Sequence, residues 1–275
     1  LLATALLSCS PDSDLPTHTA VIEEAIIGGK TSSAAQNAVV LLQIDDSATC
    51  TGTLVAPKLV LTARHCVSET DAELLCAADG SPVRGGRVGQ DIDPERIIVY
   101  VGQRQSVLEA RARGAQLVHG AADNLCNNDI AFLVLDRAVT DTPLAALRMR
   151  ETTRVGELIT SIGWGLTKQG ELPKVRLQRR AVPILDVGPS PETPPHELLV
   201  GESICSGDSG GPALSDRGAI IGVVSSGGNG SFDEFRPELG CIGPDTTNIY
   251  TRVAPFSELV ARAFTLAGAT PLVED

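Results

Sequence analysis

The sequence predicts an all-β protein that ends in one short helix. Between residues 38 and 254, β-branched or aliphatic runs are separated by Gly, Pro, Asn and Asp, which is typical of strands joined by turns. No regular alternation of strands with long helical segments occurs, so a parallel α/β sheet is disfavoured. An antiparallel barrel or sandwich follows, and a chain of 275 residues can form one as a single domain.

Short apolar segments mark the expected strands. The stretch 185–201 contains four prolines and is expected to be a loop, and 227–247 is the other long irregular stretch. The expected strands cover residues 38–44, 51–56, 59–63, 96–102, 130–135, 157–165, 175–184, 212–215, 219–226 and 248–253.

The helix is expected at the C-terminal end. Residues 255–267 place apolar side chains on one face at helical spacing, and Gly268 is expected to end the helix. The apolar face consists of Phe256, Leu259, Val260 and Phe264.

Composition and charge exclude several classes of function. The chain is 43% hydrophobic and 20% charged, which is typical of a globular protein that buries a sizeable core. Its net charge is −12 and no run of Lys and Arg exceeds a pair, so nucleic acid is not expected as a partner. No apolar run reaches about 18 residues, so membrane attachment would require a lipid or a partner.

The seven cysteines indicate an oxidising compartment rather than a metal site. They include no C-x-x-C pair, and no histidine lies at a zinc-site spacing from them, so no metal and no other cofactor is expected. Leu6-Leu7-Ser8-Cys9 resembles the bacterial lipoprotein box, in which the cysteine becomes the lipidated first residue; the alternative is an ordinary signal peptide. With Cys9 lipidated, six cysteines remain for three disulfides.

The chain divides into three parts on this interpretation. Residues 1–9 are the remainder of a signal sequence with its lipoprotein box, and 10–25 are a polar propeptide or tether. The folded domain covers 26–275. We expect a protein that is secreted or held at the cell envelope, with an outer-membrane lipoprotein as one form.

The strongest local signal is Gly207-Asp208-Ser209-Gly210-Gly211-Pro212. It also fits G-x-S-x-G, the nucleophile elbow of α/β-hydrolases, but in that fold a histidine follows the serine, and none follows Ser209. A nucleophilic serine needs an imidazole to take its proton and a carboxylate to hold the imidazole in the right tautomer. The histidine must therefore lie upstream.

Four histidines are available upstream. His18 lies in the leader, and solvated surface positions are expected for His119 and His196. His65 ends the apolar segment L-T-A-R-H-C, where the adjacent cysteine holds its position. His65 is therefore the candidate base.

Several segments together resemble the chymotrypsin family of serine proteases. L-T-A-R-H-C around His65 is similar to that family's T-A-A-H-C box, N-D-I-A-F-L around Asp129 to N-D-I-x-L-L, and the segment around Ser209 to G-D-S-G-G-P. Further matches are I-I-G-G at 26–29, G-W-G at 163–165 and I-Y-T-R-V at 249–253. The resemblance implies a chymotrypsin-like fold of two antiparallel six-stranded β-barrels with a C-terminal helix.

The resemblance also implies a serine endopeptidase that acts through an acyl-enzyme. Ser209 would be the nucleophile, His65 the general base and then acid, and Asp129 the carboxylate that orients the imidazolium. The backbone N–H groups of Gly207 and Ser209 would form the oxyanion hole. Ser225 would donate a hydrogen bond to the triad carboxylate.

The substrate pocket follows from the same resemblance. Ser203, six residues before the nucleophile, would form its floor, where a protease that cuts after Lys or Arg has Asp. Asn248 would narrow its depth, so we expect cleavage after uncharged medium-to-large side chains such as Leu, Met or Phe. Either Glu202 or Asp245 could instead reach the pocket and supply a carboxylate. The backbone that pairs with an extended substrate would come from Ser225, Ser226 and Gly227.

Disulfides and activation complete the implied site. Family bridges would pair Cys50 with Cys66 and Cys205 with Cys241, and elimination leaves Cys76 with Cys126. We expect a zymogen cut between Ala25 and Ile26, whose new ammonium group would pair with Asp208.

Three further expectations concern surroundings and partners. Arg64 replaces a small residue of the His box and is expected to point outward. Acidic clusters at 71–73 and 91–95 lie where some relatives bind calcium, but solvated charge is the favoured interpretation. We expect a monomer acting on protein or peptide substrates. The alternative is a catalytically inactive binding protein of the same fold, although such relatives usually lose the histidine or the serine.

Overall fold

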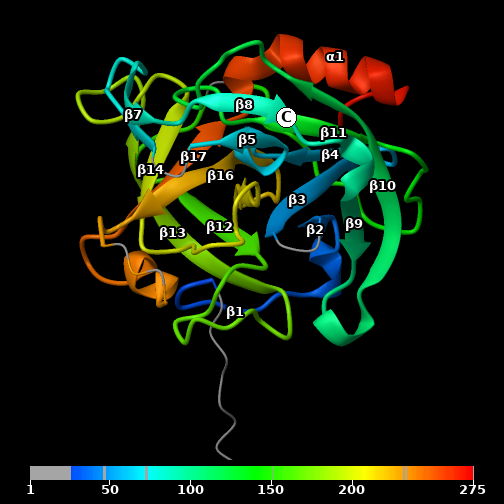
Figure 1. Ribbon diagram of the computed structural model, residues 1–275, viewed down its shortest axis with the longest axis horizontal. Helices are drawn as coiled ribbons and strands as arrows, with labels where there is room; N and C mark the ends of the chain where they lie inside the picture. The colour runs from blue at the N-terminus through cyan, green and yellow to red at the C-terminus, as the bar shows by residue number, and fades with distance from the viewer. Residues whose placement is uncertain are drawn as a thin grey trace, which may run out of the picture.

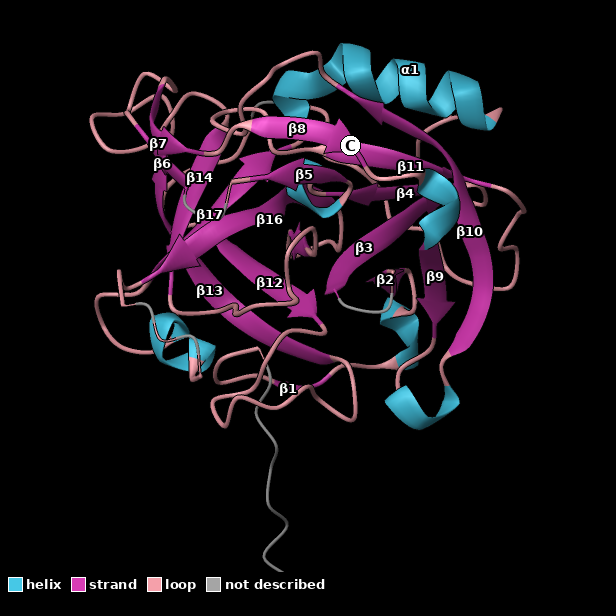
Figure 2. Cartoon of the chain, in the orientation of Figure 1, coloured by secondary structure: helices cyan, strands magenta, loops and turns pink. Residues whose placement is uncertain are grey.

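Two closed antiparallel β-barrels of six strands each form the body of the molecule (Figure 1). The structure is a computed structural model and describes residues 26–45, 48–71, 74–150, 152–231, 233 and 235–274. Strands predominate, and α1 (Ser257–Ala267) is the one α-helix within these ranges (Figure 2). The expectation of an all-β, chymotrypsin-like fold with a C-terminal helix is confirmed.

The first barrel is built from the N-terminal half of the chain and closes in the order β10-β11-β4-β3-β2-β9. All of its pairings are antiparallel. Its strands are β2 (Val39–Ile44), β3 (Ala48–Ala56), β4 (Leu59–Thr62), β9 (Ile97–Val101), β10 (Glu109–His119) and β11 (Ala131–Leu135).

The second barrel runs in the order β13-β12-β15-β16-β17-β14, and the pairing of β13 with β14 closes the ring. The short β1 (Lys30–Thr31) adds to the free part of β13. The barrel strands are β12 (Leu158–Gly163), β13 (Leu177–Val187), β14 (Glu197–Gly201), β15 (Pro212–Leu214), β16 (Ile220–Gly228) and β17 (Thr247–Arg252).

Short elements decorate the barrels. Two small antiparallel pairs join β5 (Ser68–Thr70) to β8 (Val88–Asp91) and β6 (Leu74–Cys76) to β7 (Pro82–Gly85). Single 3₁₀ turns lie at Ala34–Gln36, Arg64–Cys66, Pro94–Arg96, Gln105–Val107, Pro237–Cys241 and Ala254–Phe256.

The alternation of side chains along β11 shows how the core is divided. All five residues of β11 are buried, because the strand has apolar surroundings on both faces. Leu133 points into the first barrel, whereas Phe132 packs in a second cluster with residues of α1 and of the other barrel. A separate cluster, which includes Leu198 and Tyr250, fills the second barrel.

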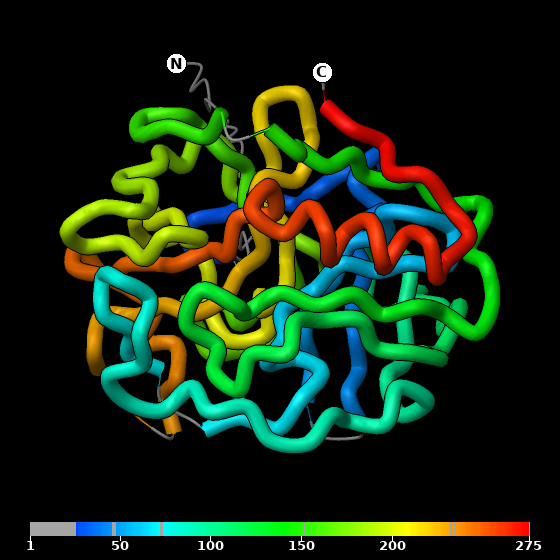
Figure 3. The backbone as a smooth tube through the Cα atoms, turned by 90° about the horizontal axis from the view of Figure 1, so that it is seen from above, coloured from blue at the N-terminus to red at the C-terminus, as the bar shows by residue number. Residues whose placement is uncertain are grey.

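Helix α1 covers the outside of the first barrel (Figure 3). Leu259, Val260 and Phe264 are buried beneath it, as their helical spacing predicts. Gly268 ends the helix with a φ of +64°, a left-handed conformation that glycine adopts without a Cβ clash. The chain then returns to pair with Leu147 in the connection between the barrels.

Two of the barrel strands, β10 and β14, were not predicted, nor were the short strands outside the barrels. β10 carries several charged residues with small ones between them, so its sequence lacks the apolar run of a strand. The expectation that 185–201 is a loop is wrong at both ends, because β13 continues to Val187 and β14 begins at Glu197. The four prolines lie between these strands, and Leu198 and Val200 point into the barrel.

Candidate active site

Two neighbouring strands of the first barrel bring His65 and Asp129 together. β4 and β11 are antiparallel, with Thr62 paired to Ala131, so a residue just after β4 lies beside one just before β11. His65 lies in the 3₁₀ turn that follows β4. Its Nδ1 atom is 2.7 Å from Asp129 Oδ2, and its backbone N–H donates to Asp129 Oδ1 at 3.0 Å.

The Asp129 carboxylate is fully buried and has a third donor. Ser225 Oγ donates to Asp129 Oδ2 at 2.6 Å. Because the carboxylate faces Nδ1, the ring proton lies there, and Nε2 is left as the basic nitrogen. Burial disfavours the protonated imidazole, but the charge and hydrogen bond of Asp129 outweigh it and raise the pKa of His65 above its usual value.

Ser209 lies where the two barrels meet. Its carbonyl oxygen accepts the N–H of Thr51 in β3 at 2.8 Å, and Cys66 Sγ lies 3.6 Å from the same oxygen. The serine is therefore held against the turn that carries His65. Gly210 follows with a φ of +76°, and a Cβ atom there would lie 2.1 Å from Thr62 Oγ1, so this position requires glycine.

The N–H groups of Gly207 and Ser209 have no acceptor among the described residues. Gly207 has a φ of +98°, and its carbonyl oxygen accepts a hydrogen bond from Thr51 Oγ1 at 2.9 Å. The turn is thus fixed from the first barrel, while its N–H groups remain available.

Asp208 is fully buried directly before Ser209. Its two carboxylate oxygens accept the N–H groups of Gly165 at 2.7 Å and Cys205 at 2.9 Å. Burial raises its pKa to about 7, although these two hydrogen bonds act in the opposite direction. A Cβ atom on Gly163 would lie 2.1 Å from Asp208 Oδ1, which explains glycine in the G-W-G segment.

Ile26 is also fully buried, and it packs with Leu177. Its φ of +46° is unusual for a β-branched residue. Arg179 donates to the carbonyl oxygens of Ile27, at 2.8 Å, and of Glu202. These contacts hold the start of the described chain beside the segment that leads to Ser209.

Two residues expected to form a specificity pocket, Ser203 and Asn248, lie close together in the structure. Ser203 and Asn248 are both buried, and Asn248 Nδ2 donates to Gly201 O at 2.8 Å and Ser203 Oγ at 3.4 Å. Asn248 is paired with Gly227 across β16 and β17. A Cβ atom on Gly227 would lie 2.2 Å from Asn248 Oδ1, so the carboxamide lies between Gly227 and Ser203. The neighbouring Ser226 is half-buried.

Of the two carboxylates that could supply a charge to the expected pocket, Glu202 is held by other groups and Asp245 lies at the surface. Glu202 Oε2 accepts the N–H of Gly243 at 2.7 Å, and Oε1 lies 3.4 Å from Arg179 NH1. Asp245 is exposed.

Three disulfides brace the site: Cys50–Cys66, Cys76–Cys126 and Cys205–Cys241. The pairing inferred by elimination, Cys76 with Cys126, is among them. Cys50, Cys66 and His65 bring their ligand atoms within 4.8 Å of one another. The disulfide between the two sulfurs leaves no thiolate there to bind a metal ion.

The expectation that Arg64 points outward is wrong. Arg64 is only 7% exposed, and its NH2 lies 2.8 Å from Asp91 Oδ1 on β8. Asp91 belongs to one of the acidic clusters; it also accepts hydrogen bonds from Ser68 and His119. The adjacent strand thus supplies a partner that no neighbouring residue in the sequence reveals.

The two histidines expected at solvated surface positions are both partly exposed, and each also has partners within the protein. His119 is half-buried and its Nε2 lies 2.9 Å from Asp91 Oδ2. His196 is half-buried, and its ring packs edge-on against Phe256. His18 lies outside the described residues, as do Cys9, the leader up to Ala25 and residues 72–73 of the first acidic cluster.

Sequence analysis missed two buried groups near the site. Tyr250 Oη lies 2.8 Å from Ser161 Oγ and also forms a hydrogen bond with Ser203, so it links these two serines. Glu197 is 2% exposed, and its Oε1 accepts the N–H of Asn127 at 3.1 Å. A glutamate that begins an apolar run was the available signal for the second group.

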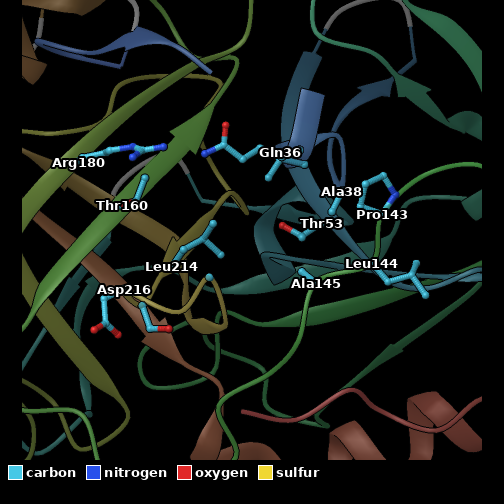
Figure 4. Close-up of a pocket in the computed structure, with 14 residues that line it drawn as sticks. Gln36, Ala38, Thr53, Pro143, Leu144, Ala145, Thr160, Arg180, Leu214 and Asp216 are labelled. Atoms are coloured by element: carbon cyan, nitrogen blue, oxygen red, sulfur yellow. The ribbon is translucent and has the colours of Figure 1, made fainter. Parts of the chain in front are cut away.

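A cavity of about 270 Å³ lies elsewhere on the seam between the barrels (Figure 4). Ala38 and Thr53 from the first barrel face Thr160 and Leu214 from the second across it. No residue of the expected triad lines it. No helix in the described part of the chain is long and apolar enough to cross a membrane.

Comparison with known proteins shows similarity along nearly the whole folded region. The family described as Trypsin matches residues 26–260. Granzyme M of Rattus norvegicus is 28% identical over 91% of this chain and 93% of its own length. Trypsin eta of Drosophila erecta is 28% identical over 78% of this chain and 77% of its own, and a trypsin of Saccharopolyspora erythraea is 24% identical over 86% and 96%.

Proposed function

The chain belongs to the trypsin family of serine endopeptidases, and we propose that it hydrolyses peptide bonds with Ser209 as nucleophile, His65 as base and Asp129 as orienting carboxylate. The observation that carries the proposal is the two-point contact of His65 with Asp129, together with the bond from Ser225. This arrangement fixes the ring and leaves Nε2 basic.

The reaction would proceed through an acyl-enzyme. Ser209 Oγ attacks the scissile carbonyl carbon while its proton passes to His65 Nε2, and the resulting oxyanion accepts the N–H groups of Gly207 and Ser209. The imidazolium then donates its proton to the leaving amine as the C–N bond breaks. Water attacks the acyl group with His65 again as base, which releases the acid and restores Ser209.

Specificity would favour uncharged side chains of medium size. Ser203 gives a substrate cation no counter-charge, and Glu202 is held by Arg179 and Gly243. The carboxamide of Asn248 occupies part of the depth beside Gly227. Leu and Met are therefore expected to be cleaved better than Phe, and all three better than Lys or Arg.

Activation would follow a cut before Ile26. The new ammonium group would pair with buried Asp208, which otherwise lacks a counter-charge. The φ of +46° at Ile26 supports this step. A φ angle at residue 26 exists only while its nitrogen is bonded to the carbonyl carbon of residue 25. Cutting that peptide bond would therefore relieve the unfavourable backbone conformation. Ala25 is not a trypsin-type cleavage residue, so the activating protease would be of another specificity.

The disulfide-bonded cysteines support a proposal about where in or outside the cell the protein acts. Three disulfides in a trypsin-like fold are typical of secreted or extracellular proteases. We further propose that Cys9 carries a lipid. Mass spectrometry of the N-terminus of the chain before the cut at Ile26 decides this point, because an uncut chain that starts beyond Ser10 without a diacylglyceryl cysteine contradicts it.

Labelling with a fluorophosphonate tests the proposed activity. Protein that starts at Ile26 should form a covalent adduct on Ser209, and the Ser209→Ala and His65→Ala variants should not. Absence of the adduct in folded, processed wild-type protein would instead favour the alternative of an inactive binding protein.

A further inference from the structure

Arg64 directly precedes the proposed catalytic base and is buried. Its NH2 lies 2.8 Å from Asp91 Oδ1, yet its Nε and NH1 atoms are buried and have no hydrogen-bond partner among the described residues. A guanidinium normally directs all of its donors to acceptors or water, and leaving two unpaired is unfavourable. The fold nevertheless retains this charge beside His65.

Asp91 fixes the guanidinium from a different strand. Besides Arg64, it accepts Ser68 Oγ at 2.8 Å, and His119 Nε2 lies 2.9 Å from its other oxygen. Arg262 of α1 in turn donates to the carbonyl oxygen of His119 at 2.6 Å. The turn that carries His65 is thereby tied to β5, β8, β10 and α1.

The charge of Arg64 also acts on the proposed triad. The charged and titratable groups around it are Asp91 from β8, Asp129 from the segment before β11 and His65 from its own turn, and His119 is reached through Asp91. Desolvation lowers the pKa of Arg64, whereas the charges of Asp91 and Asp129 oppose that effect. The charge of Asp129 thus favours the charged form of both Arg64 and His65, and two cations held near one carboxylate disfavour each other.

We propose that Arg64 is a positioning residue for the catalytic base: Asp91 holds its guanidinium against the turn of His65, and the charge disfavours protonation of the imidazole. The proposal rests on the proposed function. The chymotrypsin-family box has a small residue at this position. In this chain, Arg64 would help to set the lower end of the pH range in which the enzyme is active. The cation would keep more of His65 neutral, and therefore able to accept the Ser209 proton, at a given pH below neutrality.

Two variants of opposite charge effect test the proposal. Arg64→Gln removes the cation and should move the acid limb of kcat/KM to higher pH by about half a unit to one unit. Asp91→Asn removes an anion and should move it to lower pH, while Arg64→Lys should restore most of the wild-type profile. Arg96→Gln is the matched control, since it removes an exposed arginine of the same barrel, paired with Asp45, and should leave the limb unchanged.

Titration of His65 by NMR in the Ser209→Ala background provides a readout that does not require activity. The shifts of the Arg64 and Asp91 variants should again have opposite signs. Equal loss of kcat in both with no shift of the titration would show a structural role only and overturn the proposal. If wild-type protein is not labelled by the fluorophosphonate, the proposed function fails, but the titration still tests Arg64. If Arg64→Gln does not fold, the Asp91→Asn and Arg64→Lys titrations decide.

Discussion

The side-chain oxygen of Asn248 lies 2.2 Å from the position that a Cβ atom on Gly227 would occupy. The asparagine therefore needs glycine on the facing strand, and together these two residues set the size of the proposed pocket. Asn248→Gly should lengthen the pocket and raise kcat/KM for Phe relative to Leu by about tenfold. Peptide anilides that differ only in the residue before the scissile bond measure this ratio. An unchanged ratio would place the substrate side chain elsewhere.

Asp208 predicts a different pH dependence for the uncut and cut chains. Its carboxyl pKa is about 7 in the folded chain against 3.8 ordinarily, so the folded state holds its proton longer than the unfolded state. The free energy of unfolding of the uncut chain should therefore fall as pH rises from about 4 to 7, by a few kcal/mol in order of magnitude.

Cutting before Ile26 should remove most of that fall, because the new ammonium group favours the ionised carboxylate. Thermal unfolding of both forms at pH 5 and pH 8 measures the difference. Parallel pH dependence in the two forms would mean that Ile26 and Asp208 do not pair.

Glu197 should destabilise the protein as the pH rises above the ordinary pKa of its carboxyl group. Burial raises the pKa of its carboxyl group, the Asn127 N–H bond opposes the shift, and the charge of Asp129 adds to it. Its Oε2 is buried and has no hydrogen-bond partner among the described residues. Below the ordinary pKa of glutamate, the carboxyl group is protonated in both the folded and the unfolded chain and does not change the free energy of unfolding. Above the pKa of the folded state, the group is ionised in both, and the full loss of free energy of unfolding is present.

Glu197→Gln keeps an oxygen for Asn127 and removes the charge. Its free energy of unfolding, relative to wild type, should therefore increase from pH 4 to pH 8. Denaturant titrations at both pH values measure the increase, and a constant difference would contradict it.

The Cys76–Cys126 disulfide closes a loop with a sequence separation of 50 and ends three residues before Asp129. Replacing both cysteines with serine should lower the free energy of unfolding by about 2 to 4 kcal/mol, because the unfolded chain gains freedom. Denaturant unfolding of the double variant gives the value. If the free energy of unfolding falls no further than it does when an exposed residue is replaced with serine, the bridge does not stabilise the fold.

The parts of the fold and the candidate site that could be predicted are those with local chemical requirements. Asp208 needs glycine at residues 163 and 165, and the turn at Ser209 needs Gly210. These glycines can therefore be recognised from the sequence. The apolar runs of the inner strands could also be predicted, because they too meet a local chemical requirement. β10 could not be predicted from the sequence, because its outward face is charged.

Burial that depends on a distant partner could not be predicted. Arg64 looks like a surface arginine until β8 places Asp91 beside it, and His119 becomes half-buried through the same carboxylate. The engagement of Glu202 by Arg179 and Gly243 likewise arises only when separate segments meet.

The central claim is that Ser209, His65 and Asp129 act as one catalytic unit, and hydrolysis by the Asp129→Asn variant tests it most directly. In protein that starts at Ile26, this change should keep the fold but lower kcat/KM on a Leu anilide by on the order of 10⁴-fold, because the imidazole would lose its orienting charge and its correct tautomer. Ser209→Ala should lower it at least as far. Folded Asp129→Asn protein that retains activity within tenfold of wild type would contradict the account.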